Sequence, residues 1–230
     1  MSRLKYTDRC RTVKVNMTPT DPARASPAER ILAAADKLFY HHGIRAVGVD
    51  AVAAEAGVSK RTLYNYYATK DDLIAAYLVA RFRHIAPSDA PAREQLLGYF
   101  DHLERVFAKS DYRGCPYVNA VCELSDPKHA AVGIALQFKE QRRQWMRALL
   151  QRIGANDADA LATQLQLLAE GAVSAALVHG DPVPALARAA RAAAEVLIDA
   201  SLKPSADTRA ARSRSHGRPK QREAAPSSRG

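Results

Sequence analysis

Apolar residues recur at three- and four-residue spacing through most of the chain, which is the pattern of amphipathic helices. The first predicted helix begins at Pro27, with Ser26 as its N-cap and Glu29 at the capping-box position. It is expected to end at Gly43, because glycine readily adopts the left-handed conformation that closes a helix. The pattern and these boundary residues favour a helical protein from the start.

Two shorter helices follow the first. Residues 49–56 predict a helix of barely two turns, closed by Gly57, and Ser59 is the N-cap of the next helix. Two helices of this length joined by a glycine-containing turn form a helix-turn-helix pattern, whose second helix enters the major groove of DNA. In that second helix only Leu63 and Tyr67, spaced four residues apart, are expected to point inward.

The other side chains of residues 59–67 are suited to contact DNA. Long polar or aromatic side chains on the outward face can reach base edges in the major groove, while hydroxyl and ammonium groups can reach phosphate oxygens. The predicted base contacts are Lys60, Arg61, Tyr64 and Asn65. The predicted phosphate contacts are Ser59, Thr62, Tyr66 and Lys70.

The remainder of the chain continues with helical spacing. Further helices are predicted over about 70–85, 96–111, 128–153 and 158–178. A short helix is expected to open in 113–120 and to stop at 125–127, and a last helix to start at Pro182 and Pro184. In the longest of them, Arg142, Arg143 and Arg147 are expected to form a solvated face opposite the apolar stripe. The helix over 158–178 is apolar nearly all round and needs burial on most sides. The last two helices are therefore expected to pack against their copies in a homodimer.

The net charge of the chain lies in its two ends. The chain has 230 residues, with 34 Lys and Arg against 24 Asp and Glu. Residues 1–25 hold six basic and two acidic residues and 201–230 hold eight and two, so the part between them has no net charge. Both ends are poor in regularly spaced large apolar residues and are expected to be disordered basic tails that strengthen nucleic-acid binding.

The sequence offers no recognisable catalytic or metal chemistry. Cys10, Cys115 and Cys122 lack the paired spacing of a zinc site, and no phosphate-binding loop, nucleophile elbow or dinucleotide fingerprint is found. A protein without cofactor, metal or enzymatic activity is expected. The chain has no run of 18 uncharged apolar residues and no apolar block near its N-terminus, so a cytoplasmic protein without a membrane partner is predicted.

Residues 31–73 resemble the DNA-binding domain of TetR-type (tetracycline-repressor-like) transcriptional regulators. The matching segments are Ala56-Gly57-Val58-Ser59, Thr62-Leu63-Tyr64, Tyr66-Tyr67 and Lys70-Asp71-Asp72-Leu73. Two positions depart from the family. Val47-Gly48 stands where Thr or Ser often provides a phosphate contact, and Arg61 replaces a common Gly. We therefore predict that Arg61 supplies operator specificity.

The resemblance implies an all-α protein with an N-terminal three-helix helix-turn-helix domain and a larger C-terminal helical ligand-binding and dimerisation domain. The predicted division is 1–25 tail, 26–73 DNA-binding domain, 74–200 ligand-binding and dimerisation domain, and 201–230 tail. An effector pocket in the second domain is expected to be mostly aromatic, with a few polar groups. Its candidate residues are Tyr99, Phe100, His102, Phe107, Tyr117, Asn119, Phe138 and Trp145.

The predicted function is a homodimeric, sequence-specific transcriptional regulator, a repressor that a small apolar effector releases from a double-stranded DNA operator. Two alternatives stay open at this point. The basic tails would also suit a nonspecific nucleoid-type or RNA-binding protein, which would lose most of its affinity when 201–230 is deleted. A helical enzyme that retains a DNA-binding domain would turn over a bound compound without giving a DNA footprint.

Overall fold

The computed structural model describes residues 25–82, 88–179 and 183–202, and every regular element in these ranges is an α-helix. The all-α prediction is confirmed. The described helices are α1 (Pro27–His42), α2 (Val49–Glu55), α3 (Lys60–Tyr66), α4 (Lys70–Arg81), α5 (Ala92–Phe107), α6 (Pro116–Leu124), α7 (Ala130–Arg152), α8 (Ala158–His179) and α9 (Pro184–Ser201). The predicted tails fall almost entirely outside the described residues.

Local sequence determines where α1 begins and ends. The Ser26 hydroxyl accepts a hydrogen bond from the Glu29 amide at 3.3 Å, and the Glu29 carboxylate accepts one from the Ser26 amide at 2.8 Å. Gly43 follows the helix with a φ of 90°, a conformation that side chains with a Cβ rarely adopt. The predicted capping box and terminating glycine are confirmed, but the ψ of Gly43 is 148°, so it does not adopt the predicted left-handed helical conformation.

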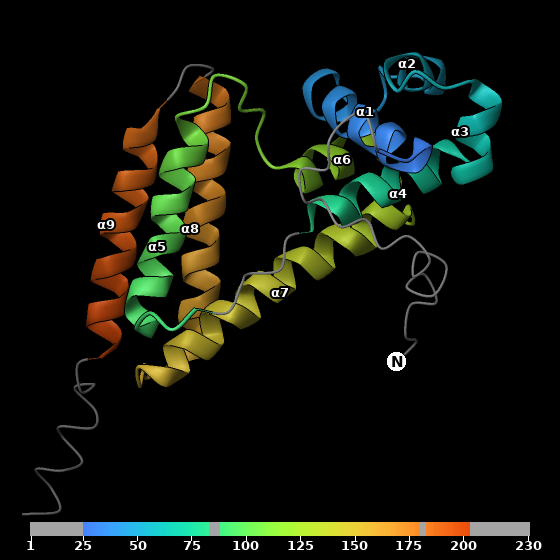
Figure 1. Ribbon diagram of the computed structural model, residues 1–230. Coiled ribbons are helices and arrows are strands. Elements are labelled where there is room, and N and C mark those ends of the chain that lie inside the picture. Colours follow the sequence, from blue (N-terminus) through green and yellow to red (C-terminus); the bar gives the residue numbers. More distant parts are fainter. Residues whose placement is uncertain (1–24, 83–87, 180–182, 203–230) are drawn as a thin grey trace, which may run out of the picture.

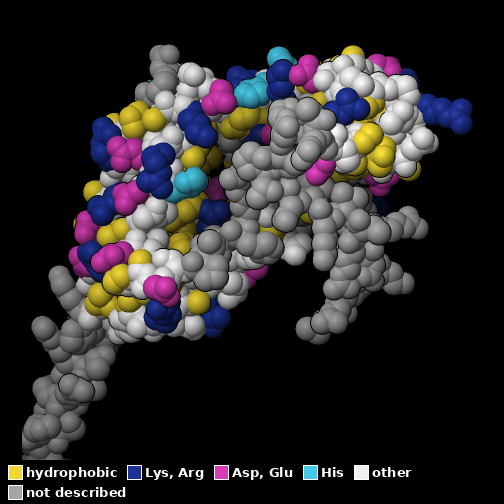
Figure 2. Space-filling model, in the orientation of Figure 1, with side chains coloured by type: hydrophobic (Ala, Val, Ile, Leu, Met, Phe, Trp, Pro, Cys, Tyr) yellow, Lys and Arg dark blue, Asp and Glu magenta, His cyan; other side chains and the backbone are white. Residues whose placement is uncertain are grey.

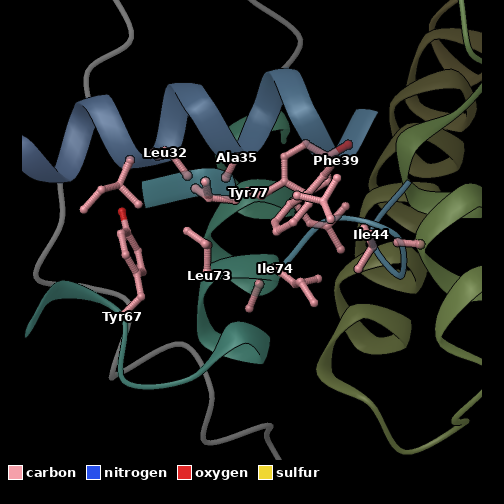
Figure 3. Packing of buried hydrophobic residues seen from close by; sticks show 14 of the residues in the cluster. Leu32, Ala35, Phe39, Ile44, Tyr67, Leu73, Ile74 and Tyr77 are labelled. Atoms are coloured by element: carbon pink, nitrogen blue, oxygen red, sulfur yellow. The ribbon is translucent and has the colours of Figure 1, made fainter. Parts of the chain in front are cut away.

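The first four helices share a core with α6 and the start of α7. Figure 3 shows how apolar side chains of α1 and α4, among them Leu32, Phe39 and Tyr77, meet between the two helices. The rings of Phe39 and Tyr77 lie edge to face, with centroids 5.6 Å apart. Leu63 is fully buried, and the Tyr67 hydroxyl donates to the Ala28 carbonyl at 3.4 Å, so both residues point inward as predicted.

A second core lies in the C-terminal half. Helices α5, α8 and α9 stand side by side as a bundle, and α7 runs from the base of this bundle to α1–α4 (Figure 1). We call α1–α4 the head and α5–α9 the body. The N-terminal part of α7 packs into the first core and its C-terminal part packs into the second. Helix α7 therefore connects two hydrophobic clusters that are otherwise separate.

Several predicted boundaries move by a few residues, and the helix predicted over 96–111 lies at Ala92–Phe107. The helix predicted from 128 begins at Ala130, because the His129 ring nitrogen caps it by accepting from the Ala131 amide at 3.0 Å. Helix α4 ends at Arg81, and the predicted continuation to 85 falls mainly in 83–87, outside the described residues.

Helix α8 alone among the described helices is long and apolar enough to cross a membrane. Its most apolar window is 33% buried within the protomer, and Leu161 and Leu165 belong to the second core. A helix that packs in the core of a protein has the same length and composition. The outward side of α8 nevertheless remains apolar, with Leu167 and Val178 exposed.

Candidate DNA interface and effector region

Helix α3 is a short helix fixed by its cap and its inward side chains. The Ser59 hydroxyl accepts from the Thr62 amide at 3.0 Å and lies 2.8 Å from the Thr62 hydroxyl. Leu63 and Tyr67 hold the opposite side of the segment in the core. The remaining side chains of α3 consequently emerge on one outward face.

All four predicted base-contacting residues lie on this outward face. Lys60, Arg61, Tyr64 and Asn65 are exposed, Tyr64 to 41%. The Lys60 ammonium donates to the Asp50 carboxylate on α2 at 3.0 Å, and this bond raises the pKa of Lys60. Arg61 forms no ion pair or hydrogen bond with a described residue, which leaves all its donors available to a ligand.

The predicted phosphate-contacting residues lie in the same stretch, from the N-cap of α3 to the start of α4. Tyr66 is exposed, whereas the hydroxyls of Ser59 and Thr62 already take part in the α3 cap. The Lys70 ammonium donates to the Ile44 carbonyl at 2.6 Å, and its partial burial lowers its pKa. An ammonium group has three hydrogens, so Lys70 can still donate to a second acceptor.

The start of α2 lacks a side-chain cap. Gly48 occupies the N-cap position and makes no side-chain hydrogen bond there. Because glycine has no side chain, this end of α2 offers no hydroxyl at the N-cap.

The contacts that join the head to the body could not be predicted from the sequence. The Tyr40 hydroxyl donates to the Gly114 carbonyl at 3.1 Å and accepts from the Arg113 amide at 3.0 Å. At the other end of α6, the Glu123 carboxylate accepts from the Arg45 amide at 3.0 Å. Two hydrogen-bonded junctions therefore connect the C-terminal end of α1 to the segment that contains α6.

An open pocket of about 390 Å³ lies between these two junctions. It is lined by Tyr40, His42, Gly43, Arg113, Asn119, Cys122, Glu123 and Leu177. Asn119, a candidate for the effector pocket, therefore lies here at the head, where its amide donates to the Arg113 carbonyl at 2.7 Å.

The other candidate pocket residues separate into two groups. Phe100 and Phe107 are buried in the second core, while Tyr117 is buried in the first and stacks on Phe138 with centroids 4.0 Å apart. Tyr99 and Trp145 lie edge to face at 6.2 Å, beside the second core. His102 is exposed on α5. The structure thus brings Tyr99 and Trp145 together beside the second core, and Tyr117 and Phe138 together at the first core.

The prediction that Arg142 lies on a solvated face of α7 is wrong. The Arg142 guanidinium lies over the Tyr99 and Phe138 rings, 4.5 and 5.1 Å from their centroids, instead of facing solvent. The reason is helical geometry, since Arg142 follows Phe138 by four residues and so shares its face. Arg143 and Arg147 both pair with Asp159 on α8, and only 21% of the Arg143 side chain is exposed.

Within the described ranges, no group of three His, Cys, Asp or Glu residues could hold a metal ion. Cys115 and Cys122 are both free thiols, and Cys115 accepts a weak contact from the Lys139 ammonium at 3.5 Å.

Comparison with known proteins shows which family this chain resembles, independently of the geometry described above. The family model described as "Bacterial regulatory proteins, tetR family" matches residues 31–77, which cover most of α1 through α4. A solved TetR transcriptional regulator of Streptomyces avermitilis is 35% identical, with a TM-score of 0.64 over 77% of this chain and 98% of that chain. Similarity to this regulator therefore extends across both cores.

The curated relatives match mainly in the DNA-binding half. An HTH-type transcriptional regulator of Mycobacterium tuberculosis is 39% identical over 82 residues, which is 34% of this chain and 41% of the relative. The HTH-type transcriptional repressor SCO4008 of Streptomyces coelicolor is 35% identical over 74 residues, 32% of this chain and 38% of the relative. The matches also include a transcriptional activator, FasR of Mycolicibacterium smegmatis. The chain thus spans less than half the length of these relatives.

Proposed function

The chain belongs to the TetR family of bacterial regulatory proteins and is a DNA-binding transcriptional regulator, and we propose that it acts as a homodimeric repressor released from its operator by a small effector. The family consists of regulators and not of enzymes. Its members include both repressors and activators. We propose repression rather than activation because the S. coelicolor relative is named a repressor.

The observation that carries the proposal is the outward face of α3. Four long side chains capable of hydrogen bonding or apolar contact with bases project from a helix whose opposite side is fully buried. Arg61 is the strongest candidate for base recognition, because its guanidinium has no partner in the described protein and can bind the O6 and N7 atoms of guanine.

Exposed apolar residues on α8 and α9 support a homodimer. Leu167 and Val178 on α8 are 67% and 83% exposed, and Val196 on α9 is 68% exposed. The neighbouring outward residues of α9 are small and uncharged: Ala185, Ala189, Ala192, Ala193 and Ala200. Covering these surfaces with a second copy would remove apolar area from water and allow close helix approach.

The charged surface of the same bundle lies elsewhere. Arg93 on α5 pairs with Glu195 and Asp199 on α9, and Arg188 on α9 pairs with Glu104 on α5. Lys or Arg and Asp or Glu alternate over this bundle in Figure 2. We infer that this charged side remains in solvent, while the apolar sides of α8 and α9 form the dimer interface. Two copies of α3 would then read half-sites about one helical turn apart on the DNA.

The test is selection of a binding site from randomised duplexes, followed by footprinting on the selected sequence. The proposal expects a two-fold symmetric footprint. Arg61→Ala should lose about 1–3 kcal/mol and relax one base preference, whereas Lys70→Ala should weaken all sequences alike and reduce the salt dependence. Equal losses on cognate and random DNA for Arg61→Ala would contradict base recognition.

Deleting 203–230 separates this proposal from a charge-driven binder. A regulator that reads bases through α3 keeps its footprint without these residues, while a nonspecific nucleic-acid-binding protein loses most of its affinity. A regulator of this kind would act in the cytoplasm, where the chromosome lies. We further propose that the Tyr40 and Glu123 junctions transmit effector binding to the head, because they connect α1 directly to the α6 segment.

A further inference from the structure

Helix α7 carries polar side chains between the part that packs into the first core and the part that packs into the second. Phe138 packs against the first core, Leu149 lies in the second, and Trp145 packs against the second. Between these positions α7 carries Lys139 and Arg142, both partly buried. The boundary between the cores is thus occupied by charged side chains, which are expensive to bury unless they are paired.

Arg142 has no polar partner at this boundary. Its guanidinium lies over the Tyr99 and Phe138 rings, yet it makes no hydrogen bond or ion pair with a described residue. Its neighbour Arg143 provides the contrast, since it pairs with both Glu140 and Asp159. A guanidinium that is only partly buried and has no carboxylate of the described chain beside it has donors available to an acceptor that arrives from outside.

Two further polar groups at the same level are also unpaired. The Tyr99 hydroxyl makes no hydrogen bond with a described residue, and the Gln166 side-chain oxygen is buried without a donor. Helices α7 and α8 are antiparallel and are joined by the Lys139–Glu170 and Arg143–Asp159 ion pairs. Gln166 falls between the two α8 partners, so it lies at the level of Arg142.

The charges at this boundary determine which ligand charge would fit it. Lys139 and Glu170 neutralise each other, which leaves the single positive charge of Arg142. Burial raises the pKa of Tyr99, so its hydroxyl remains a neutral donor. Tyr99, Phe138 and Trp145 provide aromatic surface around the charge.

We propose that the effector is an organic monoanion, with an apolar or aromatic body and one oxyanion group such as a carboxylate, whose charge is bound by Arg142. The inference rests on the proposed function and specifies the chemical class of its effector. Tyr99 donates a second hydrogen bond to the oxyanion, and Gln166 accepts from a donor on the ligand body.

A matched pair of fluorescent probes tests the proposal. Anilinonaphthalene sulfonate is an aromatic monoanion, and phenylnaphthylamine has the same body without the charge. Trp145 is the single tryptophan of the chain, so energy transfer from it to the bound probe reports binding near Arg142. The full-length protein should bind the anion about 10- to 100-fold more tightly than the neutral probe, the range expected for hydrogen bonds to a charged group.

Arg142→Met should abolish this preference, and Arg143→Met is the matched control because the Arg143 guanidinium is already paired with Glu140 and Asp159. Tyr99→Phe removes only a hydroxyl and should reduce the preference several-fold, which keeps the test decisive if Arg142→Met does not fold. Equal affinity of the wild-type protein for the two probes, or an unchanged preference in Arg142→Met or Tyr99→Phe, would overturn the proposal.

Operator binding by the unliganded protein is measured separately on the selected duplex. Failure to bind any duplex would refute the proposed function without altering the anion preference. Equal probe affinities together with a clear footprint would refute the inference and leave the regulator intact. The two failures are therefore distinguishable.

Discussion

The contact between Tyr40 and the segment before α6 predicts a measurable loss of stability. Tyr40→Phe removes one hydroxyl and keeps the ring, over which the Arg81 guanidinium lies at 4.2 Å. The hydroxyl donates to the Gly114 carbonyl and accepts from the Arg113 amide. The substitution therefore deletes two hydrogen bonds between the head and the body while leaving the packing nearly unchanged.

The size of the effect follows from these two bonds. Each contributes about 0.5–1.5 kcal/mol net, and the partial exposure of Tyr40 lets water replace part of the loss. We expect the free energy of unfolding to fall by about 1–2 kcal/mol. For a chain of this length that corresponds to a Tm lower by about 2–8 °C.

The assay is denaturant and thermal unfolding followed by circular dichroism, at equal protein concentration because the proposed dimer would make stability depend on concentration. Tyr66→Phe is the control, since Tyr66 is 50% exposed and makes no hydrogen bond with a described residue. It should change stability by no more than about 0.5 kcal/mol. If Tyr40→Phe and Tyr66→Phe were equally stable, the Tyr40 hydroxyl would not hold the head to the body.

Three other expectations follow from the structure. Val178→Asp places a charge on the exposed apolar side of α8 and should give monomers with weak operator binding; a variant that remains dimeric in light scattering would contradict the interface. Leu63→Ala empties a fully buried site and should cost about 2–5 kcal/mol in unfolding experiments, with loss of DNA binding; a smaller cost would mean that α3 is not fixed by this side chain. Hydrogen bonds from Arg143 and Gln144 lower the pKa of Glu140 from 4.5 to about 2, so its stabilising contribution is present above pH 4.5 and is lost as the pH falls towards 2. Glu140→Gln should make unfolding less dependent on pH in that window, by a small amount because the group is exposed, and an unchanged dependence would argue against these bonds.

The sequence by itself determined the local features of this protein. The N-cap at Ser26, the end of α1 at Gly43 and the inward positions of Leu63 and Tyr67 all depend on residues within four positions of one another. Capping bonds and helix faces form between such near neighbours, so their pattern can be read without knowing the fold. The outward side chains of α3 could be predicted for the same reason.

The tertiary structure decided which partner each exposed or polar side chain meets. The hydrogen bonds of Tyr40 and Glu123 join residues 74 and 78 positions apart. Lys60 and Lys70 likewise find partners on neighbouring elements. Arg142 was expected in solvent, but Tyr99 on another helix gives its guanidinium an aromatic surface inside the protein. Such contacts depend on how whole helices pack against one another, and a one-dimensional pattern does not contain that arrangement.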